Sequence, residues 1–147
     1  MPRIKIVLPE KFIYSTEIPL RISDINYGGH LGNDAVLSIF QEARIRFLNQ
    51  FGYSEVNIEG SSIIMVDAAV QYKSQGFYGD VLIIKLAVDD IHRIGFDFIY
   101  LALNKKTGEE VARGKTGIAF LDYKNNKLSS VPEPFRKLIT ELKVKES

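Results

Sequence analysis

The feature that most constrains the fold is residues 33–51, which predict a helix that is apolar around most of its circumference. Its apolar residues recur at helical spacing, and a second set widens the stripe: Val36, Ile39, Phe40, Ala43 and Phe47, beside Leu37, Ile45 and Leu48. A helix of this kind is normally buried by several elements at once. The rest of the chain must therefore supply its cover.

Both ends of this helix carry matching signals. Asn33 is a suitable N-cap, and Asp34 is placed to interact favourably with the helix dipole. Gly52 is a suitable C′ residue after the last turn. Before the helix, residues 24–32 contain turn-forming residues that must end any preceding strand.

Most of the remaining chain predicts strands. Residues 12–22 alternate apolar and polar side chains, as a half-buried strand does. Four longer segments follow the helix, separated by short breaks that contain glycine: 62–74, 79–92, 95–104 and 109–123. The breaks at 92–95 and 104–108 predict hairpins, and hairpins in sequence make an antiparallel meander. With a short helix expected within 132–142, this predicts an α+β domain whose sheet curls around the long helix.

Composition excludes several classes of function. The chain has 147 residues, with 19 basic and 18 acidic side chains giving a formal net charge of +1, so neither nucleic acid nor a membrane surface is an expected partner. It has no cysteine, which excludes disulfides and thiolate chemistry, and its two histidines do not predict a metal site. No signal peptide or membrane span is recognisable, so the expected location is the cytoplasm.

The turn and the helix together resemble a known family. The segment Asp24-Ile-Asn-Tyr-Gly-Gly-His30-Leu-Gly-Asn33, followed by Leu37-Ser-Ile-Phe40-Gln-Glu42-Ala-Arg44, is similar to the hotdog-fold acyl-CoA thioesterases of the 4-hydroxybenzoyl-CoA thioesterase-like family. The similarity continues through Ile63-Ile-Met-Val-Asp67, Gly79-Asp80 and residues 114–122, and covers roughly residues 12–140. It implies one hotdog domain over residues 1–147, in which an antiparallel sheet of about five strands wraps one central helix. It implies no cofactor beyond the coenzyme A carried by the substrate.

The turn holds the first group of expected site residues. In this family the second acidic position of the motif commonly supplies a catalytic Asp, and here that position is Asn26, which can orient water or donate a hydrogen bond but cannot act as a base. His30 is expected to contact the thioester carbonyl or position Asn26, with a purely structural role as the alternative. Gly28 and Gly29 permit close backbone approach, so an N–H near Gly29 is an expected oxyanion contact.

A carboxylate is still needed as a base, and Glu42 on the helix is the leading hypothesis. The alternative is an exposed Glu42 paired with Arg46 four residues later. Asp24 is a second possible carboxylate, although an Asx residue at that place more often holds the turn.

Further contacts are expected from residues outside the turn and the helix. Tyr27 is a candidate for lining the acyl pocket, and Asn33 is a helix cap or a substrate contact. Asp67 lies within a strand and faces solvent or a partner subunit. Arg93 is a candidate for binding the phosphates of coenzyme A.

The leading hypothesis for function is hydrolysis of an acyl-CoA to the free acid and coenzyme A. Asn26 argues for the alternative of an acyl-CoA or acyl-carrier-protein binding protein that does not hydrolyse its ligand, and a hotdog dehydratase is a further alternative. An exposed edge strand predicts a homodimer or a homotetramer, with residues 62–74 at the interface.

Overall fold

A computed structural model describes residues 3–145, and it confirms the α+β fold. The elements follow the order β1 (Tyr14–Pro19), a 3-10 turn η1 (Ile22–Asp24), α1 (Asn33–Asn49), β2 (Ser62–Tyr72), β3 (Val81–Asp89), β4 (Gly95–Asn104), β5 (Glu110–Asp122), β6 (Lys127–Ser129) and α2 (Glu133–Lys145). Within these residues the sheet has six strands rather than about five, because the short β6 adds to the five that the sequence predicts.

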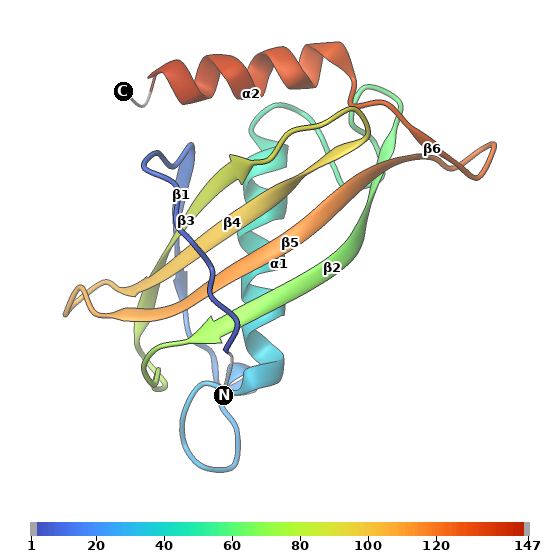
Figure 1. Cartoon of the computed structure of the whole chain (residues 1–147). Coiled ribbons are helices and arrows are strands. Elements are labelled where there is room, and N and C mark those ends of the chain that lie inside the picture. The colour runs from blue at the N-terminus through green and yellow to red at the C-terminus, as the bar shows by residue number, and fades with distance from the viewer. Residues whose placement is uncertain (1–2, 146–147) are drawn as a thin grey trace.

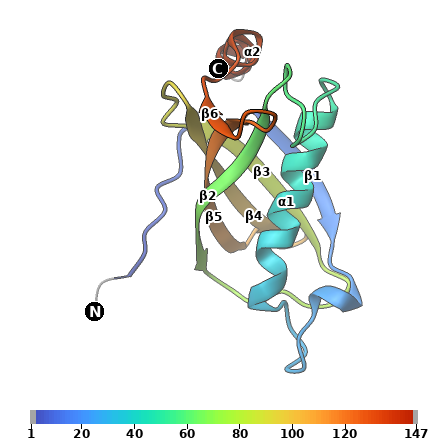
Figure 2. The same cartoon turned by 90° about the vertical axis from the view of Figure 1, so that its right-hand side faces the viewer.

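All the strand pairs are antiparallel, in the order β1-β3-β4-β5-β2, and β6 pairs with the far end of β5. The hairpins β3–β4 and β4–β5 confirm the predicted meander. The strands curl around α1, which lies on the concave face of the sheet (Figures 1 and 2). β1 and β2 form the two edges, so the strands that flank α1 in sequence lie furthest apart in the sheet.

The core lies between α1 and the concave face of the sheet. Phe47, which is fully buried, packs its ring against Tyr14, Phe51 and Phe98. Along β3, Leu82, Ile84 and Leu86 are buried while the residues between them are partly exposed, as the period of two predicts. This cover buries most of the wide apolar stripe of α1, whereas Leu37 stays 38% exposed and Ile45 is half-buried.

The helix α2 closes one end of the sheet (Figure 1). Its Phe135 is fully buried and packs against Phe96, Phe120 and Tyr53. Among residues 3–145, neither helix is long and apolar enough to cross a membrane.

Two local predictions at the start of the chain are wrong. The first strand is shorter than residues 12–22, because it spans only Tyr14–Pro19 and the chain forms η1 at Ile22–Asp24 before the turn. Asn33 is not the N-cap of α1: Gly32 holds that position in an extended conformation, and no side chain caps it. Asn33 is instead the first helical residue, and its side chain makes no hydrogen bond with any residue from 3 to 145.

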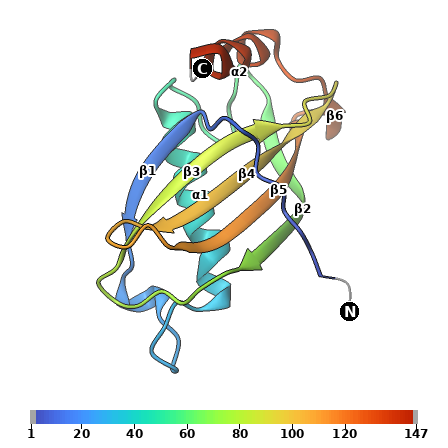
Figure 3. The same ribbon diagram turned by 60° about the vertical axis from the view of Figure 1, so that its left-hand side comes forward.

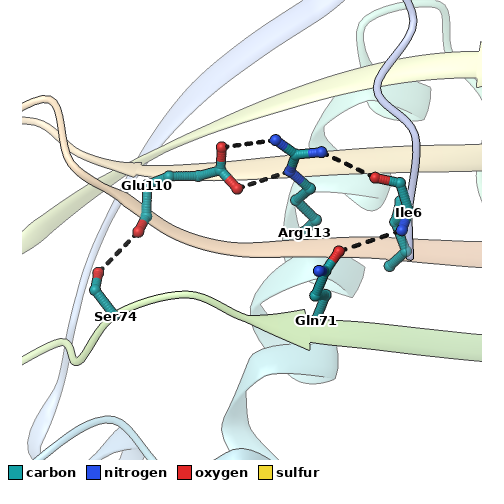
Figure 4. Close-up of polar contacts among 5 residues, drawn as sticks. All are labelled: Ile6, Gln71, Ser74, Glu110 and Arg113. Atoms are coloured by element: carbon teal, nitrogen blue, oxygen red, sulfur yellow. Dashed lines mark hydrogen bonds and ion pairs between the residues drawn. The ribbon is translucent and has the colours of Figure 1, made fainter. Parts of the chain in front are cut away.

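The N-terminal strap, residues 3–13, crosses the outer face of the sheet, opposite α1 (Figures 2 and 3). Ile6 is buried there against Ala87 and Ile99. Its N–H donates to Gln71 Oε1 at 3.2 Å, and its carbonyl accepts from Arg113 Nη1 at 3.0 Å (Figure 4). The strap therefore covers apolar surface on the outer face that the strands alone leave open.

Candidate functional site

The turn before α1 is held by Asp24, which is buried. Its Oδ2 accepts the N–H of Arg21 at 2.8 Å, and its carbonyl accepts the N–H of Gly32 at 2.9 Å. The first bond caps η1, and the second ties the two ends of the turn together. The geometry gives Asp24 the structural role that its residue type suggests, and only 5% of the residue stays exposed.

Asn26 organises the tip of the same turn. Its Oδ1 accepts from the N–H of Gly28 at 2.9 Å and lies 3.5 Å from the N–H of His30, as in an Asx turn. Gly29 has φ +89°, so the tip uses the conformational freedom that the glycine pair supplies. The amide Nδ2 makes no hydrogen bond with any residue from 3 to 145, so Asn26 keeps a donor available.

His30 lies beside Asn26 and contacts the segment before β3. Its backbone forms an isolated bridge with Phe77, and the two rings meet edge to face with centroids 6.4 Å apart. Neither imidazole nitrogen has a hydrogen-bond partner among the residues that the structure describes. Tyr27 is fully exposed next to it. The structure thus brings Asn26, Tyr27, Gly29 and His30 together at the start of α1.

Glu42 lies two turns further along the helix, on the side that faces β1. Its Oε2 accepts from Arg46 Nε at 2.8 Å, which is the i,i+4 pair that the sequence also suggests. Arg46 also donates hydrogen bonds through Nη1 to Thr16 Oγ1 and to the carbonyl of Glu17. A groove of about 190 Å³ opens here between β1, η1 and α1, and Glu42 and Asp24 both line it.

The other predicted contacts lie elsewhere in the chain. Asp67 is on the outer face of β2, where its Oδ1 accepts the N–H of Gly117 at 3.0 Å beside a break in the β2–β5 register. Arg93 is exposed in the β3–β4 hairpin. In Figure 1 this hairpin lies at the end of the sheet opposite the turn before α1. A single chain therefore does not gather Asp67 or Arg93 with Asn26 and His30.

A buried polar chain crosses the interface between helix and sheet, and sequence reasoning missed it. Arg44 is 4% exposed, bonds Glu55 at 2.6 Å and donates to the hydroxyl of Tyr100 at 2.9 Å. That hydroxyl lies 2.6 Å from Thr116 Oγ1. Burial raises the pKa of Tyr100, while the neighbouring Arg44 opposes that shift. The sequence did contain a signal for the burial of Arg44. This residue follows Phe40 by four positions and therefore falls on the apolar face of the helix.

Comparison with known proteins identifies the class. A family model described as the thioesterase-like superfamily matches residues 20–139. The chain therefore belongs to the thioesterase-like superfamily and is a thioester hydrolase by class.

One relative and several solved structures are similar to this chain. A protein of Aquifex aeolicus (strain VF5) named "Putative esterase" is 29% identical over 124 residues, which cover 83% of this chain and 92% of that protein. Among solved structures, a 1,4-dihydroxy-2-naphthoyl-CoA thioesterase from Synechocystis shares the fold with a TM-score of 0.80 and 20% identity, covering 88% of this chain and 96% of that one. A thioesterase from Thermus thermophilus, complexed with coenzyme A and Zn, matches with a TM-score of 0.76 and 21% identity, covering 92% and 98%.

Proposed function

We propose that this protein hydrolyses an acyl-CoA thioester to the free acid and coenzyme A, at the junction of the turn and α1. One observation carries the proposal. The side chains of Asn26 and His30 keep hydrogen-bonding groups that no residue from 3 to 145 occupies, at the start of the buried helix. Groups left open at such a place are available to a substrate.

The local chemistry supports attack on a carbonyl. The N-terminus of a helix presents backbone N–H groups and positive partial charge, which stabilise an oxyanion as it develops. Asn26 Nδ2 and the His30 imidazole can donate to the thioester oxygen or orient the attacking water. Gly29, with its positive φ, keeps this surface free of a side chain that would hold the thioester away.

The identity of the base needs its own test. Glu42 is the hypothesis that the sequence favours, and it lines a groove on the same helix. In this chain its Oε2 is bound to Arg46, so a catalytic Glu42 would accept the proton of water through Oε1. Because such exposed pairs contribute only about 0.3–0.5 kcal/mol, Glu42→Gln should leave the fold intact and report on chemistry alone.

A homodimer is the second part of the proposal. β2 is an edge strand, and it exposes Met65 and Val66, which are 50% and 59% accessible. A long edge strand with exposed apolar side chains is a template for pairing with another strand. We propose that two copies pair here, which would also bring residues of one copy, such as Asp67, toward the other.

The test is thiol release from a panel of acyl-CoAs: acetyl to palmitoyl, benzoyl, phenylacetyl and 1,4-dihydroxy-2-naphthoyl. The last is included because a structural neighbour acts on it. Turnover of at least one substrate supports the proposal. Binding of acyl-CoA without any thiol release would contradict it and favour the non-hydrolytic binding protein, for which Asn26 at the usual Asp position is the argument.

A further inference from the structure

The carboxylates of Asp24, Asp34, Glu42 and Asp80 lie close to the turn or to α1, and three of them are already engaged. Asp24 and Asp80 each accept a backbone N–H, and Glu42 is paired with an arginine on its own helix. Asp34 differs, because its side chain makes no hydrogen bond or ion pair with any residue from 3 to 145. A hydrogen bond on one carboxylate oxygen leaves lone pairs on the other, so each of the three engaged carboxylates keeps one oxygen. In Asp34 both oxygens are without a partner among residues 3–145, and either can accept the proton of water. On this ground Asp34 is the best placed of the four.

The position of Asp34 is defined by Gly32. A methyl group built on Gly32 would stand 2.6 Å from Asp34 Oδ1 and 3.6 Å from Asn26 Cβ, so both side chains flank the same glycine. Asp34 and Asn26 are therefore neighbours across a residue that has no side chain.

Gly28 likewise lies between two side chains, those of Asn26 and His30. A methyl group on Gly28 would stand 3.2 Å from Asn26 Oδ1 and 3.5 Å from His30 Nε2. The two glycines thus gather Asp34, Asn26 and His30 into one polar cluster at the start of α1. The side chain of Asn26 stands next to both of the others.

We propose that Asp34 is the general base of the hydrolysis, taking the part of the carboxylate that is missing at position 26. This inference rests on the proposed function. Asp34 accepts a proton from water as the water oxygen bonds to the thioester carbon. The tetrahedral intermediate then collapses, the C–S bond breaks, and the protonated Asp34 gives its proton to the departing thiolate. The products are the acid and the free thiol, and Asp34 returns to its carboxylate form.

The first variant is Asp34→Asn, which keeps the shape of the side chain and removes the base. We expect kcat to fall at least about 100-fold on the best substrate of the wild type, as for loss of a general base. Retention of kcat within about threefold would overturn the inference. Glu42→Gln, measured in parallel, would identify Glu42 as the base if it alone abolished turnover.

A structural role for Asp34 needs a separate control, because a carboxylate in the first turn stabilises a helix by about 0.3–1 kcal/mol. The swap Asn33→Asp with Asp34→Asn keeps a charge in that turn but moves it by one residue, about 100° around the helix. We expect the swap to restore the melting temperature and not the activity. Recovery of activity together with stability would show that Asp34 serves only the helix.

The decisive variant returns a carboxylate to the turn through Asn26→Asp in the Asp34→Asn background. A carboxylate can accept the same N–H bonds that the amide oxygen of Asn26 accepts, so this variant should keep the turn. We expect it to recover at least about 10-fold of the lost kcat, because a base at the usual family position replaces the one removed. If kcat did not recover, a carboxylate at position 26 could not replace the one at position 34, which would contradict the inference.

The failure of this inference and the failure of the proposed function are distinguishable. If the wild type releases no thiol from any acyl-CoA, the proposed function itself fails. An active wild type that Asp34→Asn leaves unchanged would overturn only the assignment of Asp34 as the base.

Discussion

Arg44 donates Nη1–H to the hydroxyl of Tyr100 at 2.9 Å, in the buried layer between α1 and β4. This bond joins α1 to the central strand β4 and fixes the rotation of α1 about its own axis. Because Arg44 also binds Glu55, its charge is compensated without reaching solvent. The turn and the start of α1, where the proposed site lies, take their position from this helix.

Tyr100→Phe should destabilise the protein by about 1–3 kcal/mol, because it leaves a buried N–H of Arg44 and the buried hydroxyl of Thr116 without their shared partner. Urea unfolding followed by circular dichroism measures the change. Tyr53→Phe is the matched control, since its hydroxyl bonds Glu59 near the surface. The control should lose less than about 1 kcal/mol. Equal losses in the two variants would contradict the importance of the buried chain.

Gly114→Ala should cost about 1–3 kcal/mol, because the added methyl would overlap the ring of Phe40. That ring cannot retreat easily, since it stacks on Tyr100 with centroids 4.6 Å apart and an interplanar angle of 9°. Phe40→Leu in the Gly114→Ala background should cost less than the sum of the two single changes. Strict additivity in this double-mutant cycle would show that the two residues do not compete for space.

The stability of the protein should depend on the charge of Asp97. Burial raises the pKa of this carboxyl above its ordinary value of 3.8, although Lys115 lies 3.5 Å away and opposes the shift. The folded state favours the neutral form of Asp97. This carboxyl therefore stabilises the fold fully at pH values below its ordinary pKa, and that stabilisation is lost as the pH rises through the raised pKa. The free energy of unfolding of Asp97→Asn, relative to the wild type, should therefore increase as the pH rises above the ordinary pKa of 3.8.

Asp122 provides the opposite case for that experiment. Hydrogen bonds from Asn125 hold the pKa of Asp122 below its ordinary value. The charged form of Asp122 therefore stabilises the fold at pH values above its ordinary pKa, and this stabilisation is lost as the pH falls. If Asp122→Asn and Asp97→Asn showed the same pH trend, the assignment of the Asp97 effect to its buried site would be wrong.

Val66→Lys should weaken self-association if β2 forms the dimer interface. A charge on the exposed edge is a known barrier to strand pairing. Light scattering should give about twice 16.6 kDa for the wild type and a mass near 16.6 kDa for the variant at micromolar concentration. Val7→Lys, on the exposed part of the N-terminal strap, is the control and should keep the wild-type mass. A wild type that stays at 16.6 kDa would contradict the proposed dimer.

The architecture was predictable because it depends on periodicity and turns. The glycine-containing break at residues 92–95 predicts a hairpin between strands in 79–92 and 95–104, and the structure confirms their antiparallel pairing as β3 and β4. Other details depend on contacts far along the chain. β6 has three residues and exists because β5 extends past β4, and the irregularity near Asp67 is set by its pairing with Gly117. No local pattern carries that information.

The site was predictable in part for a similar reason. The resemblance located the turn, and the structure brings Asn26 and His30 together there. Asn33 failed as a cap because Gly32, with no side chain, takes the extended conformation that begins the helix. The engagement of each carboxylate could not be read from sequence. Asp24, Asp34 and Glu42 look alike until their hydrogen bonds are known.

The N-terminal strap has a consequence for the order in which the chain folds. Gln71 on β2 and Arg113 on β5 bind Ile6 through their side chains, and Arg113 is 107 residues away from it along the chain. These side chains can hold Ile6 only after β2 and β5 have paired. We expect amide exchange to protect β5 early in refolding and Ile6 among the last, and local opening in the native state to release the strap first. The outer face would then become transiently exposed without loss of the helix and sheet beneath it.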